Sequence, residues 1–143
     1  MSMPAPQTQR DIEALADSLS ASADTIHARL MRAIGQHAPD GAGPAISQAA
    51  AQALFDDEVK LRQQAMGLYL QAATLAAGGL AGVQRQLQEI TTQAQQKIAR
   101  IDRIKDVIAL TGELLSLAAA VATGAPDKLV APYEKLKQRV ESL

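Results

Sequence analysis

The sequence predicts an all-α fold, in which three long coiled-coil-like helices form an antiparallel bundle and a short C-terminal helix follows. Apolar residues recur at spacings of three and four through most of the chain, which is the period of one helix face. No stretch alternates apolar and polar residues between turn signals, as a half-buried strand would. The length of 143 residues suits one domain. We therefore expect a single helical domain over 1–143.

The stretch from Leu54 to Ile108 carries the strongest period. Leucines recur every seven residues before a glycine cluster, and aliphatic residues continue the pattern after it. This rhythm is typical of a helix that presses one seam against other helices. The residues of this seam that we expect to contact a partner are Leu61, Leu68, Leu75, Leu87, Ile90 and Ile101. The same residues would equally suit a wholly internal core.

The same period, together with residues typical of turns, predicts the first two helices. Residues 1–7 are expected to be loose, and a first amphipathic helix is expected over 9–34, with Gly35 in the position that often ends a helix. Proline, glycine and aspartate over 37–43 predict a loop. A second helix is expected over 44–77, because Pro44 suits a first turn.

Gly78, Gly79 and Gly82 interrupt the pattern. Each glycine in a helix interior costs about 1 kcal/mol relative to alanine, so the cluster favours a turn that folds the chain back. The alternative is one long helix with small residues where another helix crosses closely. The sequence leaves both arrangements open.

A third helix is expected over 83–123 and a short last helix over 126–142. Gly124 is expected to end the third helix. Pro132 either kinks the last helix or marks its true first turn.

Composition and charge limit the possible functions. The chain is 48% hydrophobic but only 2% aromatic, which favours closely approaching alanine- and leucine-rich helices. A net charge of −1, with no basic cluster interleaved with aromatics, gives no reason to expect nucleic-acid binding. The absence of cysteine excludes disulfides and thiol chemistry.

The residues that could carry chemistry are few. Asp24 and His27 could supply two ligands of a metal site. A di-iron bundle needs Glu-x-x-His motifs, however, and none occurs in the sequence. Glu113 lies in a strongly apolar run, where it would either point to water or meet an arginine or lysine of another helix. We therefore expect no catalytic site, no metal, no cofactor and no enzyme.

A membrane-active or pore-forming type of helical protein is the alternative reading. No charged residue occurs between Arg62 and Arg85, and a second apolar segment covers 107–123. The segments 63–84 and 107–123 could form a conditional membrane hairpin, although the first is mild for membrane insertion and the second carries Glu113 near its centre, which is costly in a membrane.

We expect a non-catalytic, bacterial-type helical interaction protein: an adaptor, a secretion chaperone, a toxin-neutralising partner or an assembly subunit. It would act through its alanine- and leucine-rich seam, on a protein partner or on itself. The first residues lack the pattern of a secretory signal, which predicts a cytoplasmic location, with export by a signal-less route left open.

Overall fold

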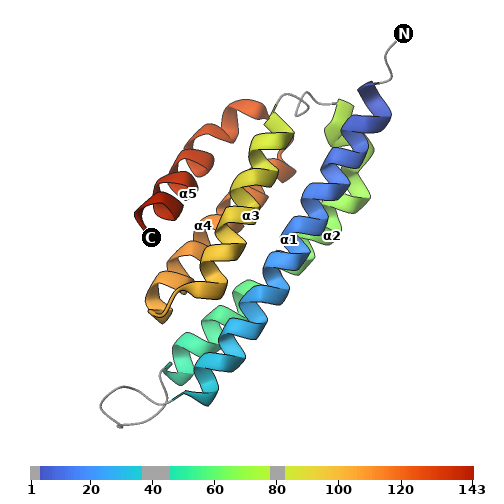
Figure 1. Ribbon diagram of the computed structural model, residues 1–143. Helices are drawn as coiled ribbons and strands as arrows, with labels where there is room; N and C mark the ends of the chain where they lie inside the picture. Colours follow the sequence, from blue (N-terminus) through green and yellow to red (C-terminus); the bar gives the residue numbers. More distant parts are fainter. Residues whose placement is uncertain (1–3, 37–45, 78–82) are drawn as a thin grey trace.

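The computed structural model describes residues 4–36, 46–77 and 83–143, which form helices and no strand (Figure 1). The elements in chain order are α1 (Pro4–Gly35), α2 (Gln48–Ala77), α3 (Gln84–Arg100), α4 (Ile104–Ala122), the 3-10 turn η2 (Pro126–Lys128) and α5 (Val130–Ser142). The predicted all-α class is therefore confirmed for the described part of the chain.

Four helices surround a common core, and the fifth lies against one side of them. α1 packs against α2 and α3, and α4 also packs against α2 and α3, so these four helices close a ring. α5 packs against α3 and α4, on the left of Figure 1, while α1 and α2 lie on the right. No described helix therefore covers the outer sides of α1 and α2.

Side-chain contacts set the register between α1 and α2. These contacts are Asp17 with Tyr69, Asp24 with Arg62 and His27 with Glu58. The residue numbers rise along α1 while they fall along α2. Figure 1 also shows the lower ends of both helices reaching beyond the connection between α3 and α4.

The periodic aliphatic residues form the core. On α2 these buried residues are Leu54, Leu61, Ala65, Leu68, Ala72 and Leu75. On α1 they are Ile12, Leu15, Ala16, Leu19, Ala23, Ile26, Leu30 and Ala33. Small alanines alternate with larger leucines and isoleucines, which lets the helices approach closely. The loss of this apolar surface from water stabilises the bundle.

The helix predicted over 83–123 is in fact two helices, because residues 101–103 interrupt it. The backbone is extended at Ile101 and at Arg103. The buried side chain of Arg29 on α1 donates from Nε to the carbonyl of Ile101 at 3.0 Å and from Nη2 to the carbonyl of Asp102 at 2.9 Å. These carbonyls are freed where the helix stops, and a cation at a helix C-terminus also suits the helix dipole. A distant arginine thus supplies hydrogen-bond partners to the backbone of the interruption.

Several helices also begin or end at residues other than those predicted. α1 begins at Pro4 and not at residue 9. α2 begins at Gln48, whereas Pro44 and the loop predicted over 37–43 lie outside the described residues. The last helix is divided into η2 and α5, and Pro132 lies in the first turn of α5, where no intrahelical partner for its missing N–H is needed. Gly124 follows α4 with a positive φ of 73°, as expected for a residue that ends a helix.

The glycine cluster lies outside the described residues. α2 ends at Ala77 on one side of it and α3 begins at Gln84 on the other. In Figure 1 α2 rises toward this cluster and α3 descends from it, so these two segments do not form one continuous long helix.

Candidate interaction surface

The six residues predicted to contact a partner lie inside the bundle or at its edge. Leu61, Leu68, Leu75, Leu87 and Ile90 are at most 5% exposed, and Ile101 is partly buried. Their side chains pack among the chain's own helices. A partner could reach the five buried residues only after these helices separate, so the surface of the closed bundle consists of other residues.

Large apolar side chains that remain exposed are concentrated on α1 and α2. Of nine such residues in the described part of the chain, seven belong to these two helices: Met31, Ile34, Phe55, Val59, Met66, Tyr69 and Leu70. The other two, Val130 and Leu143, belong to α5 or follow it. The outer side of α1 and α2, which no other described helix covers, thus carries most of the large apolar side chains that are exposed among the described residues.

Phe55, Val59, Met66 and Leu70 form what we term the α2 outer stripe. They follow one another at spacings of four, seven and four residues, so at about 100° per residue they project within about 60° of one another. Leu70 is 82% exposed and Met66 is 60% exposed. The side chains of the buried leucines project from α2 on roughly the opposite side. A surface helix usually has a polar outer face, whereas α2 is apolar on two faces.

A polar network borders the stripe on the α1 side. Arg62 donates to the carboxylate of Asp24 at 2.7 Å and to that of Glu58 at 3.0 Å, and Nδ1 of His27 lies 2.9 Å from the other oxygen of Glu58. The hydrogen bond with Asp24 contributes most to raising the pKa of Arg62 above its ordinary value. The network holds α1 and α2 in register and leaves the stripe in contact with water.

Tyr69 adds an amphipathic side chain at the same border. Its hydroxyl donates a hydrogen bond to the carboxylate of Asp17, and this bond is the main reason that the pKa of Tyr69 is raised. The ring is 37% exposed. Tyrosine in such a position offers both an apolar surface and a polar handle to a partner.

The end of α1 extends this surface. Asp17 contacts Tyr69 and Asp24 contacts Arg62, so a further step of seven residues places Met31 level with Phe55. Met31 is 53% exposed and Ile34 is 47% exposed. We refer to the α2 outer stripe, its polar border, Tyr69, Met31 and Ile34 together as the α1–α2 outer face.

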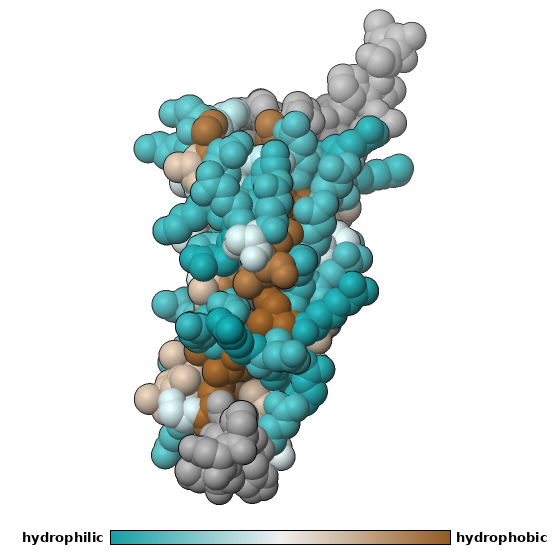
Figure 2. Space-filling view, turned by 60° about the vertical axis from the view of Figure 1, so that its left-hand side comes forward, coloured by the Kyte–Doolittle hydropathy of each residue, from teal (hydrophilic) through white to brown (hydrophobic). Residues whose placement is uncertain are grey.

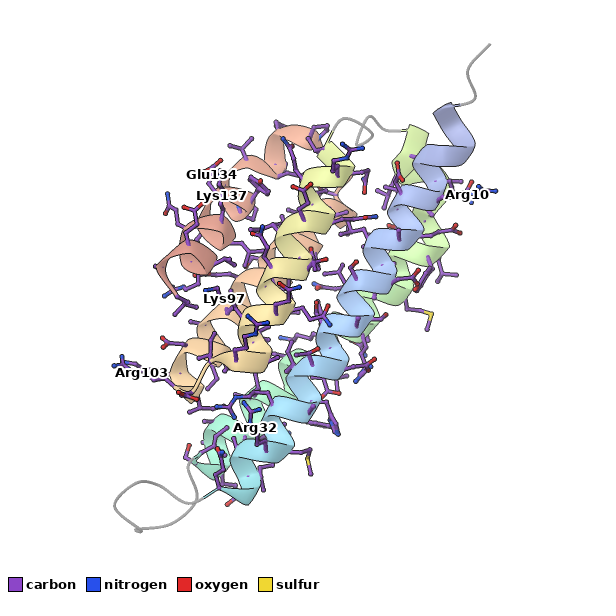
Figure 3. The ribbon with its side chains drawn as sticks, viewed as in Figure 1. Arg10, Arg32, Lys97, Arg103, Glu134 and Lys137 are labelled. Atoms are coloured by element: carbon purple, nitrogen blue, oxygen red, sulfur yellow. The ribbon has the colours of Figure 1, made fainter. Side chains whose placement is uncertain are left out.

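The opposite side of the molecule offers smaller features. Figure 2 shows a narrow apolar band between hydrophilic side chains on the side that includes α5. A cavity of about 250 Å³ between α3, η2 and α5 is lined mainly by apolar residues, which include Leu87 and Tyr133, and also by Gln86 and Glu134. A second cavity of about 450 Å³ lies beside the α3–α4 connection, where Lys97 and Arg103, labelled in Figure 3, alternate with Asp102 and Asp106. This mixture of charges favours no particular ligand charge.

The ionisable residues that the sequence singled out each make an ion pair or a hydrogen bond between helices. Glu113 on α4 accepts hydrogen bonds of 3.0 and 2.8 Å at one oxygen from Nε and Nη2 of Arg139 on α5, which raise the pKa of this arginine. Of the two alternatives for Glu113, the structure shows the contact with a basic residue of another helix. Asp24 and His27 contact different partners. Within residues 4–36, 46–77 and 83–143, no three His, Asp or Glu side chains gather to hold a metal.

The membrane hypothesis depends on the apolar segments 63–84 and 107–123. Among the helices that the structure describes, none combines the length and the hydropathy that crossing a membrane requires.

The fold and this surface define the class of the protein as an all-α helical bundle with an uncovered apolar face. A scan against protein-family models, a search of curated proteins and a search of solved structures each found no match.

Sequence reasoning missed the α2 outer stripe, although a signal for it was present. A second set of apolar residues, at 55, 59, 66 and 70, is interleaved with the leucines that recur every seven residues. One helix therefore carries more apolar side chains than a single seam can bury.

Proposed function

We propose that this protein is a non-catalytic interaction protein, which binds a helical protein surface through its α1–α2 outer face. The proposal includes the antiparallel, coiled-coil-like arrangement expected for the bundle. An adaptor, a secretion chaperone, a toxin-neutralising partner and an assembly subunit all act in this manner. The seam leucines would serve as the internal core and contact a partner only if the bundle opened.

The observation that carries the proposal is the exposure of the α2 outer stripe. Burying one large apolar side chain contributes about 1.5–3 kcal/mol. A partner that covers the stripe would therefore gain several kilocalories per mole of binding free energy. The four residues extend over about 22 Å of helix, which matches the length of a docked helix of four turns. A second helix or helical pair with its own apolar face would cover them.

The test is site-specific photo-crosslinking in the cells that naturally produce the protein. A photoreactive amino acid at position 70 is expected to form one or a few adducts of defined mass. The same probe at Thr92, an exposed position on α3, serves as the control and is expected to form none. Adding Val59→Glu and Met66→Glu to the chain with the probe at 70 is expected to abolish the adducts.

Absence of adducts at position 70, or identical adducts at position 92, would overturn the proposal. The competing membrane-active function, through 63–84 and 107–123, is addressed by flotation of the purified chain with liposomes. If the protein floats with the vesicles and its dye-release activity survives Phe55→Glu and Val59→Glu, which alter the stripe outside both apolar segments, the membrane function replaces the one proposed here.

A further inference from the structure

We propose that the occupant of the α1–α2 outer face is a second copy of this chain, turned end over end. This inference rests on the proposed function and specifies the partner for it. Two observations lead to it: the symmetry of the apolar spacing of the stripe, and the area of the uncovered side of the α1–α2 pair.

The spacing of the α2 outer stripe reads the same in both directions. The stripe is symmetric about a point between Arg62 and Gln63, because Phe55 and Leu70 lie equally far from that point, as do Val59 and Met66. A second copy in the opposite direction would place its Leu70 on Phe55 and its Met66 on Val59, and each of these contacts would occur twice. Interfaces between identical chains related by a two-fold axis have this reciprocity.

The same point is also the middle of the helix. α2 extends from Gln48 to Ala77, so its centre lies between residues 62 and 63. Two copies related about this point would therefore overlap along the full 30 residues of α2. A stripe displaced toward one end would leave part of each helix without a partner.

The area of the face suits a stable dimer. A helix of 30 residues is about 45 Å long, and two packed helices about 10 Å apart present a face about 20 Å wide. The whole uncovered side of the α1–α2 pair, which contains the α1–α2 outer face, thus offers about 900 Å² per copy, whereas a standard stable interface buries about 800 Å² on each partner. The stripe alone would offer a much smaller area.

Arg62 and Asp24 would lie near the two-fold axis. They are 2.7 Å apart within one copy, with side chains 41% and 71% exposed. Two such pairs at the axis place opposite charges next to each other in both copies. The centre of the interface would therefore carry no net like-charge repulsion, and each arginine could bind the aspartate of either copy.

The experiment measures the mass of the purified full-length chain in solution by sedimentation equilibrium over micromolar concentrations. The expected species is a dimer of twice 15.1 kDa. The double variant Val59→Glu and Met66→Glu is expected to weaken dimerisation by more than about 100-fold, since it buries four carboxylates in one interface. Val130→Glu is the control, because Val130 is 62% exposed on α5, outside the face, and should leave the dimer unchanged.

A charge-pair experiment tests the direction. In the proposed dimer residue 59 of one copy faces residue 66 of the other, so a mixture of Val59→Lys and Met66→Glu chains is expected to form a heterodimer at least about tenfold tighter than either homodimer. Both positions are exposed in the single chain, and an unchanged helical circular dichroism spectrum confirms that each variant folds. A chain that carries both substitutions decides the direction. It dimerises at least about tenfold more tightly than either single variant if residue 59 faces residue 66, and more weakly than either if residue 59 faces residue 59, because like charges then meet at both positions.

The outcomes separate this inference from the proposed function. A wild-type chain that stays monomeric, or a dimer unaffected by the glutamates, overturns the inference. If that chain still forms an adduct with another protein through position 70 in cells, the proposed function stands and the occupant is a different helical protein. If position 70 forms no adduct with any protein, both fail.

Discussion

Glu113 is a buried carboxylate in an apolar stretch, and the structure explains how it remains compatible with the core. It is 7% exposed, yet Arg139 approaches it from α5 with two nitrogen donors. Such paired, charge-assisted hydrogen bonds are among the strongest that side chains form. The contact joins α4 to α5, so a residue that could suggest catalysis from its sequence context has a structural role.

Replacing Arg139 by leucine is expected to lower the free energy of unfolding by about 1–3 kcal/mol, because the buried carboxylate loses its donors. Urea denaturation measures this change. Lys137→Leu, at an exposed position of the same helix, is the control and should have an effect within about 0.5 kcal/mol. The double variant Glu113→Leu with Arg139→Leu is expected to recover most of the loss, since no unpaired charge remains. Equal effects of the two single leucine variants would contradict this account.

At the scale of the element, α4 and the turn after it contain two glycines with different roles. Gly112 lies inside α4, and a Cβ added there would meet nothing within 4 Å. Gly124 follows the helix with a φ of +73°, and a Cβ there would lie 3.3 Å from Cδ2 of Leu75. The first glycine only weakens the helix, whereas the second permits the backbone to leave it beside α2.

Alanine at these two positions is therefore expected to have opposite effects. Gly112→Ala should stabilise the protein by about 0.5–1 kcal/mol, because alanine restricts the unfolded chain and favours a helix. Gly124→Ala should destabilise it by about 1–2 kcal/mol, because an L-residue is strained in the left-handed region. Thermal unfolding of the two variants under the same conditions gives the comparison, and a shift of the same sign in both would refute the assignment.

At the scale of the whole molecule, Arg29 connects the α1–α2 pair to the α3–α4 pair. It is 4% exposed, and burial together with the nearby charge of Arg32 lowers its pKa. Arg32 makes a single longer contact, 3.3 Å from the carbonyl of Ala99, and is exposed. Two arginines one helical turn apart thus approach the same helix end, and only one of them is buried there.

Arg29→Met is expected to lower the free energy of unfolding by about 1.5–3 kcal/mol, because carbonyls at the α3–α4 connection lose a charged donor. Hydrogen exchange should show faster exchange at the amides of Asp106 and Val107, which begin α4 and bond to the carbonyl of Arg103. Arg32→Met serves as the matched control and should change both measurements little. Unchanged exchange in the Arg29 variant would show that the connection is held by other contacts.

Much of the fold could be predicted from the sequence, and the candidate surface could be predicted only in part. The leucine period identified the buried face of α2, and Gly35 and Gly124 identified two helix ends. The interruption at 101–103 carries no glycine or proline, so it has no local signal. The stripe at 55, 59, 66 and 70 is visible as a spacing, but its exposure is not.

The sequence by itself determined that the chain is helical and which residues share a helix face, because the helical period depends only on positions along one chain. Tertiary structure alone decided which of the two apolar faces of α2 the other helices cover, and that the backbone after α3 meets the side chain of Arg29. Both depend on the arrangement of segments far apart in the chain, and a face is buried or exposed only through what lies against it.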